Sequence, residues 1–257
     1  MADASIRGRF SWHELMTTDP PAAVDFYSKV VGWGTAPYEG AGQPYTMWMA
    51  GETPIGGVMD LPEPARAMGA PPHWMGYVGT PDIHGTIKQA TGLGGNTVVP
   101  PFPVPTVGHL AVITDPQGAM ISLLQPESDM PETPQVQGHM SWCELMTPDP
   151  GAALSFYSDL FGWETMTEMD MGPAGTYFIF GRNGGMLGGV YKPQEQQGPP
   201  AWLYYALVDS ADAAVERAKA AGGQVVHGPM EVPGGDRVAV CMDPQGAMFA
   251  VHSKAAG

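Results

Sequence analysis

The sequence is poor in cysteine, in basic residues and in long apolar stretches. Its 257 residues include only two cysteines, Cys143 and Cys241, which excludes a disulfide framework and favours a reducing compartment. Lys and Arg together number 11 against 26 Asp and Glu, giving a formal net charge of −15. Because nucleic acids and anionic membranes are bound through basic surfaces, we expect neither as a partner.

No apolar run approaches the ~20 residues that a membrane-spanning helix needs. The first residues, MADASIRGR, lack the apolar core of a signal peptide, so we expect a cytoplasmic protein. Apolar residues make up 44% of the chain and charged residues only 14%, which is typical of a globular protein. The 35 glycines and 27 prolines predict many short elements joined by tight turns.

The most informative feature is an internal repeat. Residues 11–33 and 141–163 lie 130 positions apart and are identical at 15 of 23 positions. The turn sequence DPQGAM also occurs twice, beginning at Asp115 and at Asp243. Since a match of this length does not arise by chance, we predict two homologous modules. The predicted boundaries are 1–126 for the first module, 127–137 for a linker rich in proline and acidic residues, and 138–257 for the second module.

Within each module the sequence alternates between strand and helix patterns. Asp19-Pro20 and Asp149-Pro150 are typical of a helix start, because Asp caps the first turn and Pro is tolerated there. Helices are predicted over residues 22–31, 83–91, 152–161 and 211–221. Short strands fill the remaining segments, so that each module has two βαβββ units. The predicted class is α+β, with curved mixed sheets and helices packed outside them.

This pattern resembles the vicinal oxygen chelate superfamily, which contains glyoxalase I, bleomycin-resistance proteins and extradiol dioxygenases. The residues that carry the resemblance are Phe26-Tyr27 with Gly32-Trp33, Phe156-Tyr157 with Gly162-Trp163, and the two DPQGAM turns. It is closest to the tandem glyoxalase-like group labelled predicted hydroxylases, which includes mycobacterial culture-filtrate antigens. The resemblance implies two modules that pack as an internal pseudo-dimer, in a monomer or a homodimer. It leaves the activity open, because this fold hosts isomerases, lyases, dioxygenases and binding proteins.

The resemblance also implies where a divalent metal would bind, on the concave face of each module. In the first module those positions hold Trp12, Met75, Ser122 and, in a stretch that aligns less surely, Gly57. In the second module they hold Trp142, Leu203, Ala250 and Gly189. None of these is a usual metal ligand, so we predict that the usual metal is absent, and the sequence identifies no cofactor.

A metal site built from other residues is the alternative. Its candidate ligands are His13, Glu14, Glu144 and His252. Neither histidine recurs in the repeat, because Cys143 stands at the counterpart of His13 and Leu124 at that of His252. A divalent-metal-dependent lyase, isomerase or dioxygenase therefore stays open as an alternative.

One chemically useful motif does recur, Trp-x-Glu-x-Met, with Glu14 and Glu144 at its centre. Residues i, i+2 and i+4 of a strand share one face, so each Glu lies between a Trp and a Met on the same face. Because the resemblance implies that Trp12 and Trp142 hold a metal-ligand position, it also implies that this face is the concave one. Partial burial there suits a carboxyl group to acid or base catalysis. We predict Glu14 and Glu144 as catalytic residues, with a purely structural role as the alternative.

Further side chains on these strands are predicted to contact a ligand. They are Trp12, Met16, Trp48, Trp74, Tyr77, His109, Trp142, Met146, Trp202, Tyr205 and Arg237. Core packing is the competing explanation for the Trp and Met residues, whereas His109 and its counterpart Arg237 could offer a proton donor or an anion contact. An aromatic cavity with an acidic floor favours flat or cationic ligands. The sequence shows no glycine-rich phosphate loop, Ser-His-Asp arrangement or Cys-x-x-Cys pair.

Together these features predict a small-molecule protein that acts on or binds an aromatic or carbonyl-bearing metabolite without the usual metal. Besides the metal-dependent enzyme, the second alternative is a binding protein that sequesters a cationic drug, as the bleomycin-resistance proteins do. The net negative charge suits that alternative.

Overall fold

The structure of the protein, a computed structural model, describes residues 4–41, 45–130, 136–195 and 198–255. The predicted linker falls partly on residues 131–135, which lie outside the described residues. The strands and helices are, in chain order, β1 (Phe10–Thr17), α1 (Pro20–Val30), β2 (Gly34–Pro37), β3 (Thr46–Ala50), β4 (Thr53–Asp60), α2 (Glu63–Ala67), β5 (His73–Gly79), α3 (Ile83–Gly92), β6 (Asn96–Val104), β7 (Gly108–Thr114), β8 (Met120–Pro126), β9 (Met140–Met146), α4 (Pro150–Phe161), β10 (Glu164–Asp170), β11 (Thr176–Arg182), β12 (Gly185–Tyr191), β13 (Ala201–Leu207), α5 (Ala211–Ala220), β14 (Gln224–Glu231), β15 (Arg237–Met242) and β16 (Met248–Ser253).

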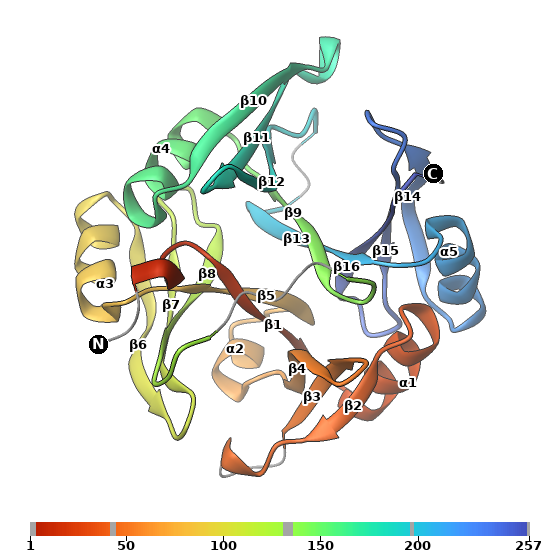
Figure 1. The fold of residues 1–257 in the computed structure, drawn as a ribbon, viewed down its shortest axis with the longest axis horizontal. Coiled ribbons are helices and arrows are strands. Elements are labelled where there is room, and N and C mark those ends of the chain that lie inside the picture. The colour runs from red at the N-terminus through yellow and green to blue at the C-terminus, as the bar shows by residue number, and fades with distance from the viewer. Residues whose placement is uncertain (1–3, 42–44, 131–135, 196–197, 256–257) are drawn as a thin grey trace. The chain divides into compact units, whose positions relative to one another are not determined.

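Each module contributes one mixed eight-stranded sheet (Figure 1). The strand order is β2-β3-β4-β1-β5-β8-β7-β6 in the first sheet and β10-β11-β12-β9-β13-β16-β15-β14 in the second. The two orders are the same under the repeat, and each sheet combines two βαβββ units, so the predicted α+β class with two tandem modules is confirmed. Among the described residues, no helix is both long and apolar enough to span a membrane.

The helix starts lie where the repeated Asp-Pro motif predicts them. The Asp19 carboxylate accepts a hydrogen bond from the Ala22 amide at 3.0 Å, and Asp149 accepts one from Ala152 at 3.0 Å. These bonds satisfy amides that the first turn of a helix leaves unpaired. At the other end of α4, Gly162 has a φ of 73°, a left-handed conformation that glycine adopts without strain.

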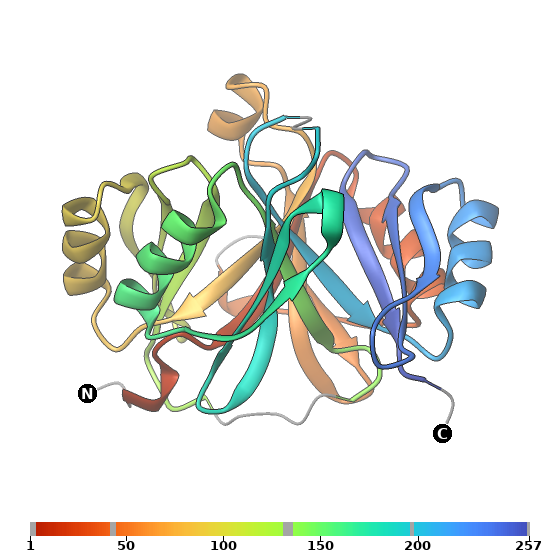
Figure 2. The ribbon, with the colours of Figure 1, turned by 90° about the horizontal axis from the view of Figure 1, so that it is seen from above.

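The compact units of the molecule do not follow the repeat. One unit comprises Met1–Ser11, Met75–Glu132 and Cys143–Trp202, and the other comprises Trp12–Trp74, Thr133–Trp142 and Leu203–Gly257. We call them the first and the second unit. Each therefore combines half of one module with half of the other. In the first unit α3 lies beside α4, and in the second α1 lies beside α5 (Figures 1 and 2).

An aromatic core lies between the helices and the strands of each unit. In the second unit, Tyr27 of α1 contacts Trp48 and Trp74, with ring centroids 5.7 and 5.3 Å apart. In the first unit, Tyr157 of α4 contacts Trp202 at 5.4 Å. Trp48, Trp74 and Trp202 are all buried in these clusters, so the prediction that they contact a ligand is wrong. Their side chains point toward the helices.

Buried tyrosine–aspartate bonds join these helices to the DPQGAM turns. The Tyr27 hydroxyl donates to Asp243 Oδ2 at 3.1 Å, and the Tyr157 hydroxyl donates to Asp115 Oδ2 at 3.2 Å. The second oxygen of each carboxylate accepts two backbone amides of its own turn. Burial raises the pKa of both aspartates. Each bond joins the helix of one module to the turn of the other, which explains why both motifs recur.

Candidate functional site

Successive side chains of a strand point to opposite faces, and on β1 the two faces differ in chemistry. Leu15 and Thr17 are fully buried, and Leu15 pairs in register with the buried Val58 of β4. Trp12, Glu14 and Met16 occupy the opposite face. We call this side, turned away from the helices, the inner face of the sheet. The repeated Trp-x-Glu-x-Met motif therefore lies on the inner face.

Glu14 is held there by Tyr45, which immediately precedes β3, the strand on the far side of β4. The Tyr45 hydroxyl donates to Glu14 Oε1 at 2.7 Å, and the Trp12 indole N–H donates to the Tyr45 hydroxyl at 2.9 Å. Glu14 is only 5% exposed. Trp12, Tyr45 and Glu14 thus form a chain of hydrogen bonds that ends on a buried carboxylate.

A glycine makes this contact possible. Gly57 pairs in register with Glu14 on one side and with Met47 on the other, so it lies between β1, which carries Glu14, and β3, which begins directly after Tyr45. A Cβ at Gly57 would lie 1.9 Å from the Tyr45 hydroxyl oxygen. The Tyr45 ring therefore crosses β4 through the space that any side chain at position 57 would fill.

The second module repeats the arrangement. The Tyr177 hydroxyl donates to Glu144 Oε1 at 2.6 Å, Glu144 pairs in register with Gly189, and a Cβ at Gly189 would lie 2.0 Å from the Tyr177 oxygen. One neighbour differs. Tyr191 stacks on Tyr177 with ring centroids 5.8 Å apart, at the position that Met59 holds in the first module.

The surroundings keep the phenols of Tyr45 and Tyr191 protonated. Burial raises the pKa of Tyr45 far above its ordinary value, and the charge of Glu14 and its hydrogen bond raise it further. Burial raises the pKa of Tyr191 to about 12, with a further contribution from the charge of Glu144. Because Tyr45 keeps its proton, it acts as a donor toward Glu14. The pair presents a carboxylate that can take up a proton and a phenol that can supply a hydrogen bond.

Sequence reasoning did not single out Tyr45 and Tyr177 as site residues. Both recur at an offset of 132, together with the glycines that they cover, so their recurrence was visible in the sequence. The roles of the tyrosines were not visible, because each role depends on the pairing of three strands.

The positions that the superfamily uses for a metal do not fit one in the second module. Leu203 and Ala250 form a buried apolar cluster with Tyr205, and Trp142, Val238 and Val240 pack against that cluster. Such side chains offer no oxygen, nitrogen or thiolate ligand of the kind that divalent metals require. Among the described residues, no group of three or more His, Cys, Asp or Glu side chains could hold a metal ion.

The alternative metal ligands do not come together either. Burial lowers the pKa of His13 to about 3, and its ring lies 5.0 Å from the Tyr204 ring. His13 lies one residue from Glu14 on β1, so the two side chains point to opposite faces. His252 has both ring nitrogens engaged, Nδ1 with Ser141 Oγ at 2.8 Å and Nε2 with Asp236 Oδ2 at 2.8 Å. The proposed set of His13, Glu14, Glu144 and His252 is therefore not assembled as a metal site.

These bonds of His252 form a Ser-His-Asp chain, so the expectation that no such arrangement exists is wrong. Ser141 is 6% exposed, whereas the side chains of His252 and Asp236 are 15% and 35% exposed. The Ser141 hydroxyl also lies 3.3 Å from the Tyr205 carbonyl oxygen. The serine is the innermost member of the chain, which is the reverse of what an accessible nucleophile needs. We assign the chain a structural role that joins β9, β16 and the turn before β15.

Two other predicted ligand contacts point away from the inner face. Arg237 donates to both carboxylate oxygens of Asp212 on α5, at 2.5 and 2.8 Å. It is adjacent to Val238, which packs on the inner cluster, so alternation places Arg237 on the helix side. Its counterpart His109 pairs with Gln125, whose side chain accepts a bond from the first residue of α3. The prediction that Arg237 and His109 contact a ligand on the concave face is wrong.

The remaining predicted contacts stay candidates. Met16 pairs with Met59 next to the Glu14 site, and Met146 pairs with Tyr191 next to the Glu144 site. Trp142 and Tyr205 belong to the apolar cluster described above. Tyr77 pairs in register with Ser122.

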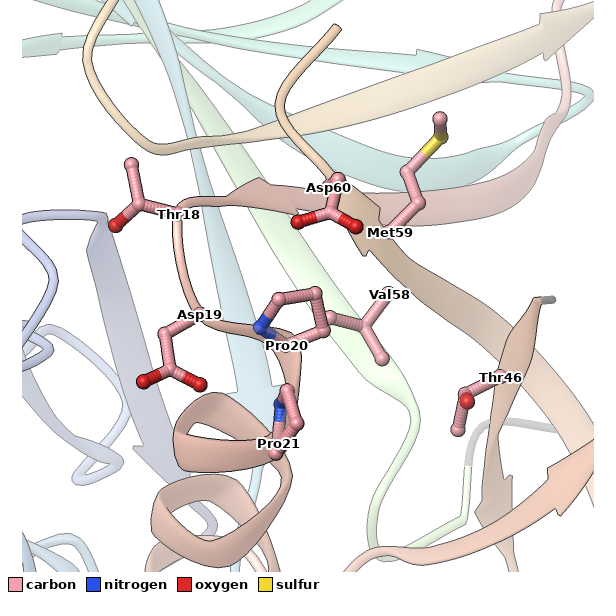
Figure 3. Close-up of a pocket in the computed structure, with 8 residues that line it drawn as sticks. All are labelled: Thr18, Asp19, Pro20, Pro21, Thr46, Val58, Met59 and Asp60. Atoms are coloured by element: carbon pink, nitrogen blue, oxygen red, sulfur yellow. The ribbon is translucent and has the colours of Figure 1, made fainter.

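A cavity of about 360 Å³ lies elsewhere in the second unit. Its lining residues are Thr18, Asp19, Pro20, Pro21, Thr46, Val58, Met59 and Asp60, at the start of α1 and the end of β4 (Figure 3). Figure 3 shows the Met59 side chain pointing away from the two prolines. Neither Glu14 nor Tyr45 lines this cavity, and the Asp19 carboxylate is used as the helix cap.

Comparison with known proteins agrees with the fold and the repeat. The family profile described as Glyoxalase/Bleomycin resistance protein/Dioxygenase superfamily matches residues 9–123 and again residues 139–251. The chain belongs to this superfamily, with one copy of the domain in each half.

Individual relatives cover nearly the whole chain. It is 34% identical over 248 residues to the Mycobacterium tuberculosis protein named "Putative glyoxylase CFP32", covering 95% of this chain and 94% of the relative. It is 30% identical over 267 residues to the anthracycline biosynthesis protein DauV of a Streptomyces species, covering 95% and 92%. Among solved structures, the Mn(II)-bound glyoxalase from Novosphingobium aromaticivorans has a TM-score of 0.69 at 12% identity, covering 97% of this chain and 83% of that one. At that identity the likeness concerns the fold alone.

Proposed function

We propose that the protein binds an aromatic or carbonyl-bearing small molecule on the inner face of its sheets and exchanges a proton with it through Glu14 and Glu144. The observation that carries this proposal recurs in both modules: a tyrosine hydroxyl crosses a glycine of the intervening strand and donates a hydrogen bond to the glutamate. A structural carboxylate needs no such arrangement in both modules. A paired carboxylate and phenol on one face suit the transfer of a proton to or from a ligand.

The chemistry proposed is the removal of a proton from a carbon next to a carbonyl group. The Glu14 carboxylate takes the proton, and the electron pair of the C–H bond becomes part of an enolate. The resulting carboxylic acid then returns the proton to the same carbon or to a neighbouring atom. The Tyr45 hydroxyl stays protonated throughout and orients Glu14, and Tyr177 does the same for Glu144.

The side chains around each glutamate favour a flat apolar ligand. Trp12, Met16, Met47 and Met59 flank Glu14 on the inner face, and aromatic or methionine side chains adapt to flat rings. One relative, DauV, is named for anthracycline biosynthesis, and anthracyclines are fused aromatic quinones. This supports an aromatic compound with carbonyl groups as the ligand class.

We further propose that the reaction needs no divalent metal. This rests on the donor set, since Trp142, Leu203 and Ala250 occupy the positions at which the superfamily holds its metal, and the first two are large apolar side chains. The proton is taken up by the Glu14 or Glu144 carboxylate, so this step is carried by residues of the chain itself.

The test uses protein treated with EDTA and the hemithioacetal of methylglyoxal and glutathione as the probe, in D2O. We expect deuterium incorporation or isomerisation, followed by NMR, that persists in EDTA. The double variant Glu14→Gln/Glu144→Gln should lose about 10²–10⁴-fold in rate, the range for an acid or base catalyst. Glu52→Gln, an exposed glutamate in the turn between β3 and β4, is the matched control and should not change the rate.

A rate that appears only after Mn2+ or Ni2+ is added would overturn the metal-independent mechanism. An unchanged rate in the double variant would overturn the role of the glutamates. Binding is measured separately, by quenching of tryptophan fluorescence with an anthracycline. Quenching without any proton exchange would show a binding protein rather than an enzyme.

A further inference from the structure

Ser122 of β8 is a buried hydroxyl that the fold leaves unsatisfied. The residue is 0% exposed, and within the described part of the chain its Oγ has no hydrogen-bond partner. A buried hydroxyl that has lost its water without gaining a partner destabilises the folded protein, and native structures contain few of them. An unsatisfied hydroxyl of this kind is therefore unusual.

The register of β8 shows which face of the sheet Ser122 occupies. It pairs in register with Tyr77 of β5 and with Val112 of β7, and the buried Ile121 and Leu123 on either side of it point to the opposite face. Ser122 thus lies on the inner face of β5–β8. Other unsatisfied buried atoms have different surroundings. Those of Trp48 and Trp202 belong to the aromatic cores, and those of Thr17 and Thr147 recur in both modules and share the helix-facing side of Leu15 and Leu145.

Apolar side chains surround Ser122 on this face, and several of them are exposed. Val99 and Phe102 of β6 pair with Val112 and Leu110 of β7, and Met120 lies two residues before Ser122 on β8. Val99, Phe102 and Met120 are each more than a third exposed. Exposed large apolar side chains that gather on one face mark a binding surface rather than ordinary solvent-facing surface.

The second module supplies a natural comparison. Its counterpart of Ser122 is Ala250, which is fully buried in the cluster with Leu203 and Tyr205. Tyr205 pairs with Ala250 as Tyr77 pairs with Ser122. The two modules thus present the same row of side chains, except that the first has a serine hydroxyl where the second has the methyl group of Ala250.

We propose that the inner face of β5–β8 binds a flat apolar small molecule and that Ser122 hydrogen-bonds to an oxygen atom of that molecule. The methionines beside Ser122, Met75 on the strand of Tyr77 and Met120 on β8, have flexible side chains that can move aside for a ring system. The equivalent face of the second module has Ala250 at this position, so it binds the molecule without a hydrogen bond to that oxygen atom. The two modules therefore differ in ligand selectivity.

This inference rests on the proposed function only in taking the ligand as a small aromatic molecule on the inner face. It does not involve proton transfer by Glu14 or Glu144. The probes are 2-naphthol and naphthalene, which differ by one hydroxyl group and carry no carbonyl-activated proton. Failure of the catalytic proposal leaves the result with these probes unchanged, and failure of the Ser122 proposal leaves the rates of the glutamate variants unchanged.

The experiment compares wild type with Ser122→Ala, using equilibrium dialysis for both probes and thermal unfolding without a ligand. The variant should bind 2-naphthol roughly 5–20-fold more weakly, as expected for the loss of one hydrogen bond, and should bind naphthalene as wild type does. Without a ligand it should melt about 2–4 °C higher, because an unsatisfied hydroxyl has been removed. If the Ser122 hydroxyl stabilised the fold instead, Ser122→Ala would lower Tm.

Ala250→Ser is the matched control, since it adds a hydroxyl to the same row of the second module. It should lower Tm, because that cluster offers the hydroxyl no partner. A lower Tm for Ser122→Ala with unchanged 2-naphthol binding would overturn the proposal. Equal weakening of both probes, or no binding of either probe to wild type, would overturn it as well.

Discussion

Replacing Gly57 with alanine tests whether the tyrosine–glutamate pair depends on that glycine. The added Cβ would lie 1.9 Å from the Tyr45 oxygen and 2.4 Å from its Cζ, and the three nearest atoms all belong to the Tyr45 side chain. Two heavy atoms that are not covalently bonded do not approach so closely, so the Tyr45 side chain must move. Its hydrogen bonds to Glu14 and from Trp12 then break together.

The expected cost follows from those two bonds. A hydrogen bond to a charged group contributes about 1.5–3 kcal/mol and a neutral one about 0.5–1.5 kcal/mol, so Gly57→Ala should destabilise by roughly 2–4.5 kcal/mol. The smaller conformational freedom of alanine in the unfolded chain offsets about 0.4–1 kcal/mol of this. A net loss of about 1–4 kcal/mol is well within reach of a urea titration followed by tryptophan fluorescence.

A double-mutant cycle isolates the cause. In a Tyr45→Ala background, Gly57→Ala should cost almost nothing, because the atoms that it would strike are gone. The same cycle applies to Gly189 and Tyr177. Gly92→Ala in α3 is the control, because nothing lies within 4 Å of its added Cβ and alanine favours a helix, so the free energy of unfolding should stay unchanged or rise.

An equal cost of Gly57→Ala with and without Tyr45 would refute the reasoning. It would mean that position 57 requires glycine for its backbone conformation, and that the tyrosine is held by other contacts.

The remaining predictions concern two histidines. Burial holds the pKa of His13 at about 3, whereas a histidine of the unfolded chain has a pKa near 6.5. The free energy of unfolding should therefore be highest above pH 6.5 and should decrease as the pH falls, by about 2 kcal/mol at pH 5. His13→Phe should lose this decrease and the exposed control His84→Gln should keep it, whereas a decrease that survives in His13→Phe would assign it to other groups. His252→Leu, which copies Leu124 of the first module, should lower the free energy of unfolding by about 1–3 kcal/mol because Ser141 and Asp236 lose their common partner. A urea midpoint equal to that of wild type would show that the Ser-His-Asp chain contributes nothing.

The repeat made most of the fold predictable. Recurrence of the Asp-Pro starts and of the DPQGAM turns made the order of elements predictable, because each aspartate accepts backbone amides of its own helix start or turn. The additional bonds of the turn aspartates to tyrosines of distant helices could not be predicted in this way. The helix predicted at residues 83–91 also forms, as Ile83–Gly92.

The errors about Trp48, Trp74 and Trp202 have a different origin. Assigning Met75 and Leu203 to the concave face already places Trp74 and Trp202, one residue earlier, on the other face. Alternation along the strand was therefore sufficient to assign these two tryptophans to the core. Large aromatic side chains suggested a ligand site, but their size makes them equally suited to fill the space beneath a helix.

The tyrosine–glutamate pair could not be derived in this way. Glu14 was identified from its neighbours on one strand, whereas Tyr45 reaches it from the start of β3, a strand that lies two positions away from β1 in the sheet. Such a contact depends on register and on the missing side chain at Gly57. A single sequence shows the glycine and the tyrosine but not the alignment that brings them together.

The interleaved units have a consequence for how the chain folds during synthesis. The second unit needs residues 203–257 as well as residues 12–74, so the strands made early cannot complete their unit until the late ones have left the ribosome. A nascent chain that stops near residue 130 exposes α1 without α5 and Tyr27 without Asp243. Separate fragments 1–126 and 138–257 should then behave as complementary halves that are soluble and ordered only when expressed together.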